Sequence, residues 1–379
     1  MSVDMTLTPE QLRVQKLARD FAATQIIPIA AKHDKSGEFP EFIVKRALEV
    51  GIFPHSISKK YGGPGYDVVS QSLIVEELGY ACCAFANILT GNLLSAHLVS
   101  LAGSEELKKY YMGKITAGGL AGFAITEPGA GSDAGSVAST ARLDGDEWVL
   151  NGSKCFASFC SYAKVILVIA STNLEKGVKG LSAFVVPQEA LTGTNAEHKL
   201  GLRCSDSAEI TMKNVRVPKG NLVGEEGEGF TYAMQTLDVF RATVGSVACG
   251  LARRALDEAV KYCSERLDID GKPLIRQQAV AFKLADMAIQ IEAARDLVYK
   301  CVRLKETGQR ITKESSMAKT FATDTAMKVA ADAVRLMGAK GYSKDSVVEK
   351  LMRDIKVYQI FEGSNQIQRL VISRALTNA

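Results

Sequence analysis

Hydrophobic and polar positions divide the chain into three stretches of different periodicity. Toward both ends of the chain, apolar residues recur at the spacing of an amphipathic α-helix. Between Ala121 and Glu228, glycine and β-branched residues dominate and the periods shorten, which is typical of strands. We therefore predict an α+β fold, with an N-terminal helical domain over residues 1–121, a middle β-domain over 122–228 and a C-terminal antiparallel helical bundle over 229–379.

Local signals predict individual elements. Thr8 is expected to cap a first helix, because Pro9 suits the first helical position. The strand from Glu147 to Lys154 is expected to enter a tight turn at Asn151-Gly152. The other predicted helices lie at 41–50, 71–79, 105–114, 230–245 and beyond, 251–266, 278–305 and 312–336, and the other predicted strands at 165–170, 181–186, 209–212 and 215–217.

The stretch from Ala81 to Gly103 contains no Asp, Glu, Lys or Arg. Its length would suffice to cross a bilayer. However, Asn87, Asn92 and several hydroxyl-bearing residues make it poor membrane material. We therefore predict one or two buried helices that line a pocket, and no membrane partner.

The segment from Leu351 to Leu376 carries the first chemical hypothesis. Apolar residues at helical spacing predict a buried helix that Gly363 ends, since glycine takes the left-handed conformation found past helix ends. Glu362 then falls in the last helical turn, where the dipole disfavours a carboxylate and apolar neighbours would raise its pKa. Such a position suits a base that takes a proton near neutral pH. On this segment alone, a frayed and exposed glutamate remains the alternative.

Composition and charge narrow the classes of function. The 379 residues are 47% hydrophobic and 23% charged, which is an ordinary globular composition. A net charge of +4 is too small to indicate nucleic acid or a membrane surface. The N-terminus, MSVDMTLTPEQLRV, lacks the pattern of a signal or transit peptide. Eight scattered cysteines without a CxxC motif indicate free thiols in a reducing cytoplasm, and four widely separated histidines argue against a metal centre.

A glycine-rich segment from Phe123 to Asp133 stands at the entry to the β-domain. Its glycines and hydroxyl groups offer exposed hydrogen-bond donors that suit a pyrophosphate or a flavin edge. Gly129, Gly131 and Gly135 do not fit GxGxxG, so a Rossmann dinucleotide site is not predicted. A plain turn remains the alternative for this segment taken alone.

Seven segments taken together resemble the acyl-CoA dehydrogenase family of flavoproteins, in order and spacing, over nearly the whole chain. They are Tyr61-Gly-Gly-Pro-Gly, Glu76-Glu-Leu-Gly79, Ile125-Thr-Glu-Pro-Gly-Ala-Gly-Ser-Asp133, Leu150-Asn-Gly-Ser-Lys154, Asn221 to Phe230, Phe282-Lys-Leu-Ala-Asp-Met287 and Tyr358 to Gln368. The resemblance implies an N-terminal helical domain, a middle β-domain and a C-terminal four-helix bundle. It also implies FAD as the cofactor, in a branch similar to the short- and medium-chain enzymes.

The resemblance gives Glu362 the role of catalytic base. In the family this residue removes the α-proton of an acyl thioester while the β-hydrogen leaves as hydride to flavin N5. The thioester carbonyl is held by the backbone amide of the base and a ribityl hydroxyl of FAD, an arrangement that stabilises the developing enolate. Some relatives keep the base at the position of Phe240, which cannot take a proton. Glu362 is therefore the matching residue.

The resemblance also implies two groups of FAD-binding residues. The first group lies near the flavin and comprises Phe123, Ile125, Thr126, Gly131, Ser132, Phe156, Ala157, Ser158, Ser364 and Gln366. The second reaches the FAD of a neighbouring subunit and comprises Arg266, Asp268, Gln278, Arg335, Gly338 and Ala339. Gln277 is the alternative to Gln278 at the adenine, and an exposed helix arginine is the alternative for Arg335. Such sharing requires at least a homodimer, and the family is usually tetrameric.

Substrate contacts are implied for Ser132, Asp238, Arg241, Phe361 and Gly363. For Asp238 and Arg241 the alternative is a solvated helix face. Some positions depart from the family pattern: one residue is inserted after Arg266, Phe156 replaces a tryptophan, and Phe159 replaces a small polar residue. These departures indicate a specialised branch with altered FAD-adenine motifs.

We therefore expect FAD-dependent α,β-dehydrogenation of an acyl-CoA thioester, with electrons passed to an electron-transfer flavoprotein. Three alternatives stay open: a dehydrogenase of carrier-protein-bound acyl or aminoacyl groups, an enoyl-thioester reductase running in reverse, and a non-catalytic thioester-binding protein. A cytoplasmic location is expected, and nucleic acid, membrane and metal are not expected as partners.

Overall fold

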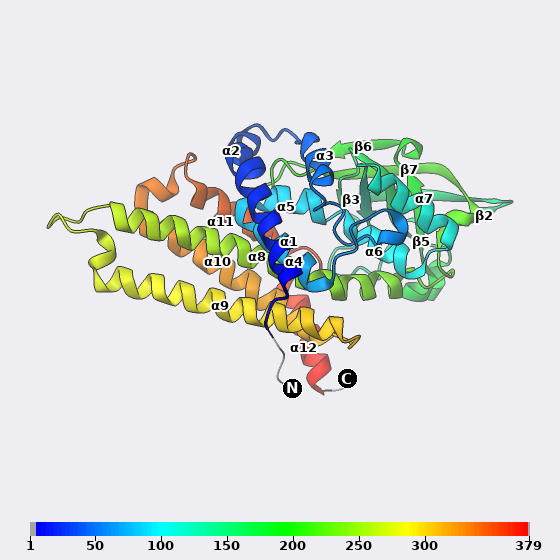
Figure 1. Cartoon of the computed structure of the whole chain (residues 1–379). Helices are drawn as coiled ribbons and strands as arrows, with labels where there is room; N and C mark the ends of the chain where they lie inside the picture. Colours follow the sequence, from blue (N-terminus) through cyan, green and yellow to red (C-terminus); the bar gives the residue numbers. More distant parts are fainter. Residues whose placement is uncertain (1–4, 378–379) are drawn as a thin grey trace.

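The computed structural model describes residues 5–377. The first four residues, which belong to the segment predicted to lack a signal or transit peptide, and the last two residues of the predicted bundle lie outside the described chain. A helical block, a β-domain and a second helical block follow one another (Figure 1), which confirms the α+β prediction. The β-domain lies at one end of an elongated molecule and the long C-terminal helices extend to the other.

Within the described residues, the N-terminal block contains seven α-helices, and a side chain caps the start of α1, α4 and α7. Thr8 accepts a hydrogen bond from the backbone amide of Gln11 while the Gln11 side chain accepts one from the Thr8 amide, which confirms the predicted helix start. The predicted helices at 41–50, 71–79 and 105–114 are also confirmed. The helices are α1 Pro9–Phe21, α2 Ile27–Ser36, α3 Phe42–Glu49, α4 Val68–Ala81, α5 Cys83–Thr90, α6 Leu93–Ala102 and α7 Glu105–Thr116.

The uncharged stretch forms two helices, α5 and α6. Cys83–Ala102 is long and apolar enough to cross a membrane, but 72% of its apolar 18-residue window is buried inside the protein. Between the two helices, the Asn92 side chain donates to the Ile88 carbonyl at 2.6 Å. The prediction of buried core helices is therefore confirmed.

The β-domain is one eight-stranded sheet in the order β6-β7-β3-β1-β4-β5-β8, with β2 paired to β3 and β4. The predicted tight turn at Asn151-Gly152 is wrong, because β3 continues through it and is paired with β7 on both sides of a register shift. Gly152 has φ +137°, and a Cβ there would lie 2.2 Å from Ser139 Oγ. The strands are β1 Leu120–Ala124, β2 Thr140–Asp144, β3 Glu147–Ser158, β4 Ala163–Ser171, β5 Leu181–Pro187, β6 Gly193–Ala196, β7 Ser207–Pro218 and β8 Leu222–Val223.

The C-terminal block is organised around one helix of 37 residues, α8. The predicted helices at 230–245 and beyond and at 251–266 form one continuous helix, in which glycine serves close packing. A Cβ at Gly250 would lie 2.0 Å from the Glu76 carbonyl oxygen, and one at Gly79 would lie 2.6 Å from the Val247 carbonyl oxygen. The helices are α8 Gly229–Glu265, α9 Gln278–Glu306, α10 Thr312–Tyr342, α11 Val347–Tyr358 and α12 Asn365–Thr377.

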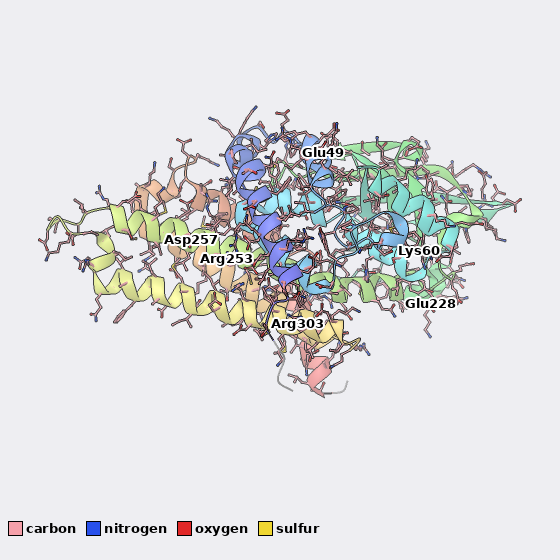
Figure 2. The ribbon with its side chains drawn as sticks, viewed as in Figure 1. Glu49, Lys60, Glu228, Arg253, Asp257 and Arg303 are labelled. Carbon is pink, nitrogen blue, oxygen red and sulfur yellow. The ribbon has the colours of Figure 1, made fainter. Side chains whose placement is uncertain are left out.

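A buried ion-pair cluster joins the two helical blocks. Glu76 on α4 is buried and accepts hydrogen bonds from Arg253 at 2.7 Å, Arg295 at 2.9 Å and the Tyr299 hydroxyl at 2.7 Å. Arg253 lies near the centre of the molecule in Figure 2. The relative position of α4, α8 and α9 is thus fixed by charge as well as by packing.

Candidate functional site

Glu362 lies in the loop between α11 and α12. Helix α11 ends at Tyr358, and the amides of Ile360 and Phe361 both donate to the Val357 carbonyl. Glu362 has φ +53° and Gly363 has φ +88°. The prediction that Glu362 occupies the last helical turn is therefore wrong: the chain leaves the helix four residues earlier, and two left-handed residues in succession turn it toward α12.

The carboxyl group of Glu362 is nevertheless withdrawn from water. The residue as a whole is half-buried, but its Oε2 atom is buried and has no hydrogen-bond partner within residues 5–377. Burial raises the pKa of Glu362 to about 7, against the lowering effect of Lys319 and Arg241. The alternative of a frayed, exposed glutamate is therefore wrong. The backbone amide of Glu362 likewise donates to no acceptor in the described part of the chain, so it is free to bind a ligand oxygen.

Arg241 on α8 lies near the Glu362 carboxyl group and pairs with Asp238 of the same helix. Arg241 is 5% exposed, and its Nη1 donates to Asp238 Oδ1 at 2.5 Å. The other Asp238 oxygen accepts the Thr312 hydroxyl at 2.5 Å. A solvated helix face is therefore wrong for Arg241, whereas substrate contact by the pair stays a prediction. Phe240 is buried with its ring 5.9 Å from that of His97, so an aromatic pair fills the alternative base position.

The glycine-rich segment is shaped by an ion pair that the sequence did not single out. Lys154 is fully buried and donates to Glu127 at 2.7 Å and to the Ile125 carbonyl at 3.2 Å. Glu127 also accepts the backbone amides of Ala138 and Ser139. Burial lowers the pKa of Lys154 to about 8, although Glu127 favours its charged form. The segment is therefore a loop fixed by this ion pair, with a turn from Glu127 to Ala130, and its contact with a pyrophosphate or flavin stays a prediction.

Two of the residues predicted near the flavin lie together next to this loop. Phe123 on β1 is paired in register with Ser158 on β3, which brings together positions 35 residues apart in sequence. Phe156 has φ +52° and is 63% exposed, although it lies between buried neighbours such as Ala157. A Cβ at Gly131 would meet no atom within 4 Å, so its backbone is open to a ligand. Ile125 and Thr126 are half-buried, Ser132 is exposed, Phe361 and Ser364 are half-buried, and Gln366 is exposed.

The second predicted group lies at the opposite end of the bundle. Arg266 follows the last residue of α8, and the 25 residues that separate it from Arg241 span about 37 Å of helix. Figure 1 shows the α8–α9 connection at the end of the molecule remote from the β-domain. One chain therefore does not bring the two groups together.

The remote group forms an exposed surface. Asp268 accepts the amides of Asp270 and Lys272 and the Gln277 side chain, so it shapes the turn and engages Gln277. Gln278, the first residue of α9, is left exposed. Gly338 has φ +55° at a kink in α10, and Arg335, Gly338 and Ala339 are exposed. Contact with FAD by these residues stays a prediction.

The residues near Glu362 fit a flavin. The predicted flavin residues offer an exposed aromatic ring at Phe156, open glycine backbone at Gly131 and a hydroxyl at Ser158, and Glu362 offers a buried carboxyl oxygen without a partner among the described residues. These groups suit a planar ring bound against Phe156 and a reactive carbon held at the carboxyl group of Glu362, and contact with FAD stays a prediction.

Family models match the chain along almost its whole length. The acyl-CoA dehydrogenase N-terminal domain matches residues 8–119, the middle domain 122–215 and the C-terminal domain 227–377. The chain is 42% identical to an acyl-CoA dehydrogenase of Bacillus subtilis (98% of this chain, 99% of the relative). It is 40% identical to an acryloyl-CoA reductase (NADH) of Anaerotignum propionicum (98% and 95%).

Solved structures agree with these sequence matches. The butyryl-CoA dehydrogenase from Megasphaera elsdenii superposes with a TM-score of 0.96 at 38% identity, covering 99% of this chain and 100% of that chain. A chain from work on the electron transferring flavoprotein of Acidaminococcus fermentans gives a TM-score of 0.96 at 39% identity, with the same coverage. Sequence and structure thus match the same kind of protein from end to end.

Proposed function

The chain belongs to the acyl-CoA dehydrogenase family of FAD-dependent oxidoreductases acting on CH–CH groups, and we propose that it desaturates an acyl-CoA thioester between the α- and β-carbons with Glu362 as the base. The observation that carries the proposal is the buried Oε2 of Glu362, which lacks a partner among residues 5–377. A carboxyl group with a pKa of about 7 can hold or release a proton at neutral pH at small cost in free energy.

The chain's own residues would perform the proton transfer. Glu362 Oε2 takes the α-proton, and the free amide of Glu362 donates to the thioester oxygen where negative charge develops. Lys319 and Arg241 stabilise the carboxylate beforehand, since both lower its pKa. FAD, when bound, supplies the acceptor for the hydride that leaves the β-carbon. Phe156 and Ser158 would hold the flavin ring at the site.

We propose an electron-transfer flavoprotein as the electron acceptor. The Acidaminococcus fermentans match at 39% identity supports this acceptor. The match to an acryloyl-CoA reductase that uses NADH supports a second candidate, the reverse reaction. One measurement distinguishes dehydrogenation from the reverse reduction. Acyl-CoA should be consumed when the electron-transfer flavoprotein is supplied as acceptor, whereas enoyl-CoA should be consumed when NADH is supplied as donor.

We also propose that the protein works as a homotetramer or at least a homodimer. The second group of predicted FAD-binding residues lies at the end of the molecule remote from the β-domain, which supports a cofactor site completed by a second subunit. Apolar side chains on the long helices support association, since Phe282 and Ile289 on α9 are 62% and 67% exposed. Light scattering of the purified holoprotein measures the subunit number, and a monomer that retains FAD stoichiometrically would contradict the proposal.

The substrate assignment is tested by anaerobic titration of the holoprotein with a panel of acyl-CoA thioesters and with the same acyl groups on a carrier protein. Loss of flavin absorbance identifies the thioester that is oxidised. Bleaching by carrier-bound substrates alone would replace CoA with a carrier protein. A protein that binds FAD and thioesters but is bleached by none would support a non-catalytic thioester-binding protein.

A further inference from the structure

A buried lysine on α10 lies directly behind the loop that carries Glu362. Lys319 is fully buried, and its Nζ donates to the Gly363 carbonyl at 3.0 Å and to Asn365 Oδ1 at 2.8 Å. Both acceptors are uncharged, although a buried ammonium group usually requires a charged partner. A lysine kept in so costly a place is expected to serve the site it touches.

The same loop is tied from a second side. Gln368 on α12 is fully buried, and its Nε2 donates to the carbonyls of Glu362 at 3.2 Å and Gly363 at 2.9 Å. Lys319 and Gln368 therefore share the Gly363 carbonyl. A left-handed conformation is unfavourable for a residue with a side chain such as Glu362, so it persists only where the surroundings enforce it. These hydrogen bonds provide that enforcement.

Asn365 links the loop to further residues of α10 by hydrogen bonds. Its Nδ2 donates to Thr323 Oγ1 at 2.9 Å and to Asp324 Oδ1 at 2.7 Å, and its backbone amide donates to the Gln359 carbonyl at 3.0 Å. Lys319, Thr323 and Asp324 thus anchor the loop to two successive turns of one helix. Displacement of the Lys319 side chain would remove one hydrogen bond from the Gly363 carbonyl and one from the Asn365 side chain at the same time.

Charged and titratable side chains from three helices surround the Glu362 carboxyl group. The charged or titratable groups that face Glu362 are Lys319 from α10, Arg241 from α8 and Tyr358 from α11. Arg241 already pairs with Asp238 at 2.5 Å. Lys319 faces Glu362, Arg241 and Asp324, of which Asp324 pairs with Arg369 at 2.9 Å. Lys319 is therefore the cation near Glu362 that forms no ion pair within the described residues.

We propose that Lys319 is a positioning residue for the base, which holds Glu362 in its left-handed conformation and keeps a positive charge behind its carboxyl group. This role rests on the proposed function, because it requires Glu362 to be the base. Burial lowers the pKa of Lys319 to about 8, while Glu362 and Asp324 favour its charged form, so the cation is retained at neutral pH.

Hydrogen–deuterium exchange on the holoprotein without substrate tests the geometric part. In Lys319→Met, the amides of Phe361, Asn365 and Gln368 should exchange at least about tenfold faster. Without the hydrogen bonds of Lys319, local opening of the loop costs less free energy. Lys328→Met is the matched control, since Lys328 is exposed on the same helix and should leave the exchange unchanged. Wild-type exchange rates in Lys319→Met would overturn the proposal.

The pH dependence of turnover tests the charge. Without the cation the pKa of Glu362 rises further, so the rising limb of kcat should move to higher pH by about one unit in Lys319→Met and in Lys319→Gln. Asn365→Ala should speed hydrogen exchange in the loop but leave the pH dependence of kcat unchanged. It removes the hydrogen bonds of the Asn365 side chain and keeps the positive charge of Lys319. A lower melting temperature with an unmoved pH limb in all lysine variants would reduce Lys319 to a structural residue and refute the positioning role.

The two proposals fail separately. Full turnover in Glu362→Gln would contradict the assignment of Glu362 as the base. It would not change the hydrogen-exchange rates expected at the loop in Lys319→Met. Should Lys319→Met not fold, Lys319→Gln keeps a hydrogen-bond donor at the same place and still tests the charge through the pH limb.

Discussion

Replacement of Glu362 by glutamine is expected to stabilise the resting protein, and the gain should depend on pH. The carboxyl group has a pKa of about 7 in the folded protein against 4.5 for an ordinary glutamate. A folded-state pKa above the unfolded value means that the folded protein binds the proton more tightly. The associated stability is fully present below pH 4.5 and is lost as the pH rises through 7.

The magnitude follows from these two pKa values. At about 1.4 kcal/mol per pH unit, the gap amounts to about 3.5 kcal/mol, of which about 2.5 kcal/mol is lost between pH 5 and pH 8. Glutamine does not titrate and does not lose this stability. With an unfolding entropy of about 2.1 cal/mol/K per residue over 379 residues, the Tm advantage of Glu362→Gln should grow by about 3 °C over that interval.

Thermal unfolding of the holoprotein without substrate, recorded at steps between pH 5 and pH 8, measures the effect. Glu49→Gln is the matched control, because Glu49 is exposed at the end of α3 (Figure 2) and should show no such dependence. An advantage of Glu362→Gln that is constant with pH, or that shrinks as the pH rises, would refute the inference that the buried carboxyl group is held at a raised pKa.

Three further substitutions test other parts of the structure. Lys154→Met should weaken FAD binding by about tenfold or more, because it removes charge-assisted bonds that shape the glycine-rich loop; fluorescence titration with FAD measures this, and unchanged affinity would contradict it. Glu76→Ala should lower the free energy of unfolding by about 3–5 kcal/mol, since it removes the buried acceptor of Arg295 and of the Tyr299 hydroxyl; a loss below 1 kcal/mol in urea would contradict that. Gly152→Ala should cost about 2 kcal/mol or more from its positive φ and the contact with Ser139, and neutral behaviour in the same assay would show that the strand adapts.

Periodicity predicted the architecture because the signal is long. The change from helical to strand patterning near residue 120 and back near residue 229 corresponds to the observed blocks. Gly152 was misread for a physical reason that applies to other glycines. Gly250 permits α4 to approach α8, and Gly152 permits a bulge in β3, yet both look like breaks in a sequence. Which role a glycine plays depends on neighbours that are distant in the chain.

The site was predictable in part. Glu362 was found from its motif and its apolar neighbours, but the end of α11 at Tyr358 depends on turn hydrogen bonds that the helical repeat conceals. Lys319 was missed, although a lysine among the small residues of α10 was an available signal. Its role is visible only when the loop between α11 and α12 lies against α10. The remote position of Arg266 likewise follows from the unbroken length of α8.

The base assignment is tested most directly by mixing the anaerobic holoprotein with the acyl-CoA that bleaches the wild type and following flavin absorbance in Glu362→Gln. The variant should keep its FAD and bind the thioester with nearly wild-type affinity, yet lose bleaching by several orders of magnitude. Bleaching at the wild-type rate would show that another group removes the α-proton and would contradict the assignment of Glu362 as the base.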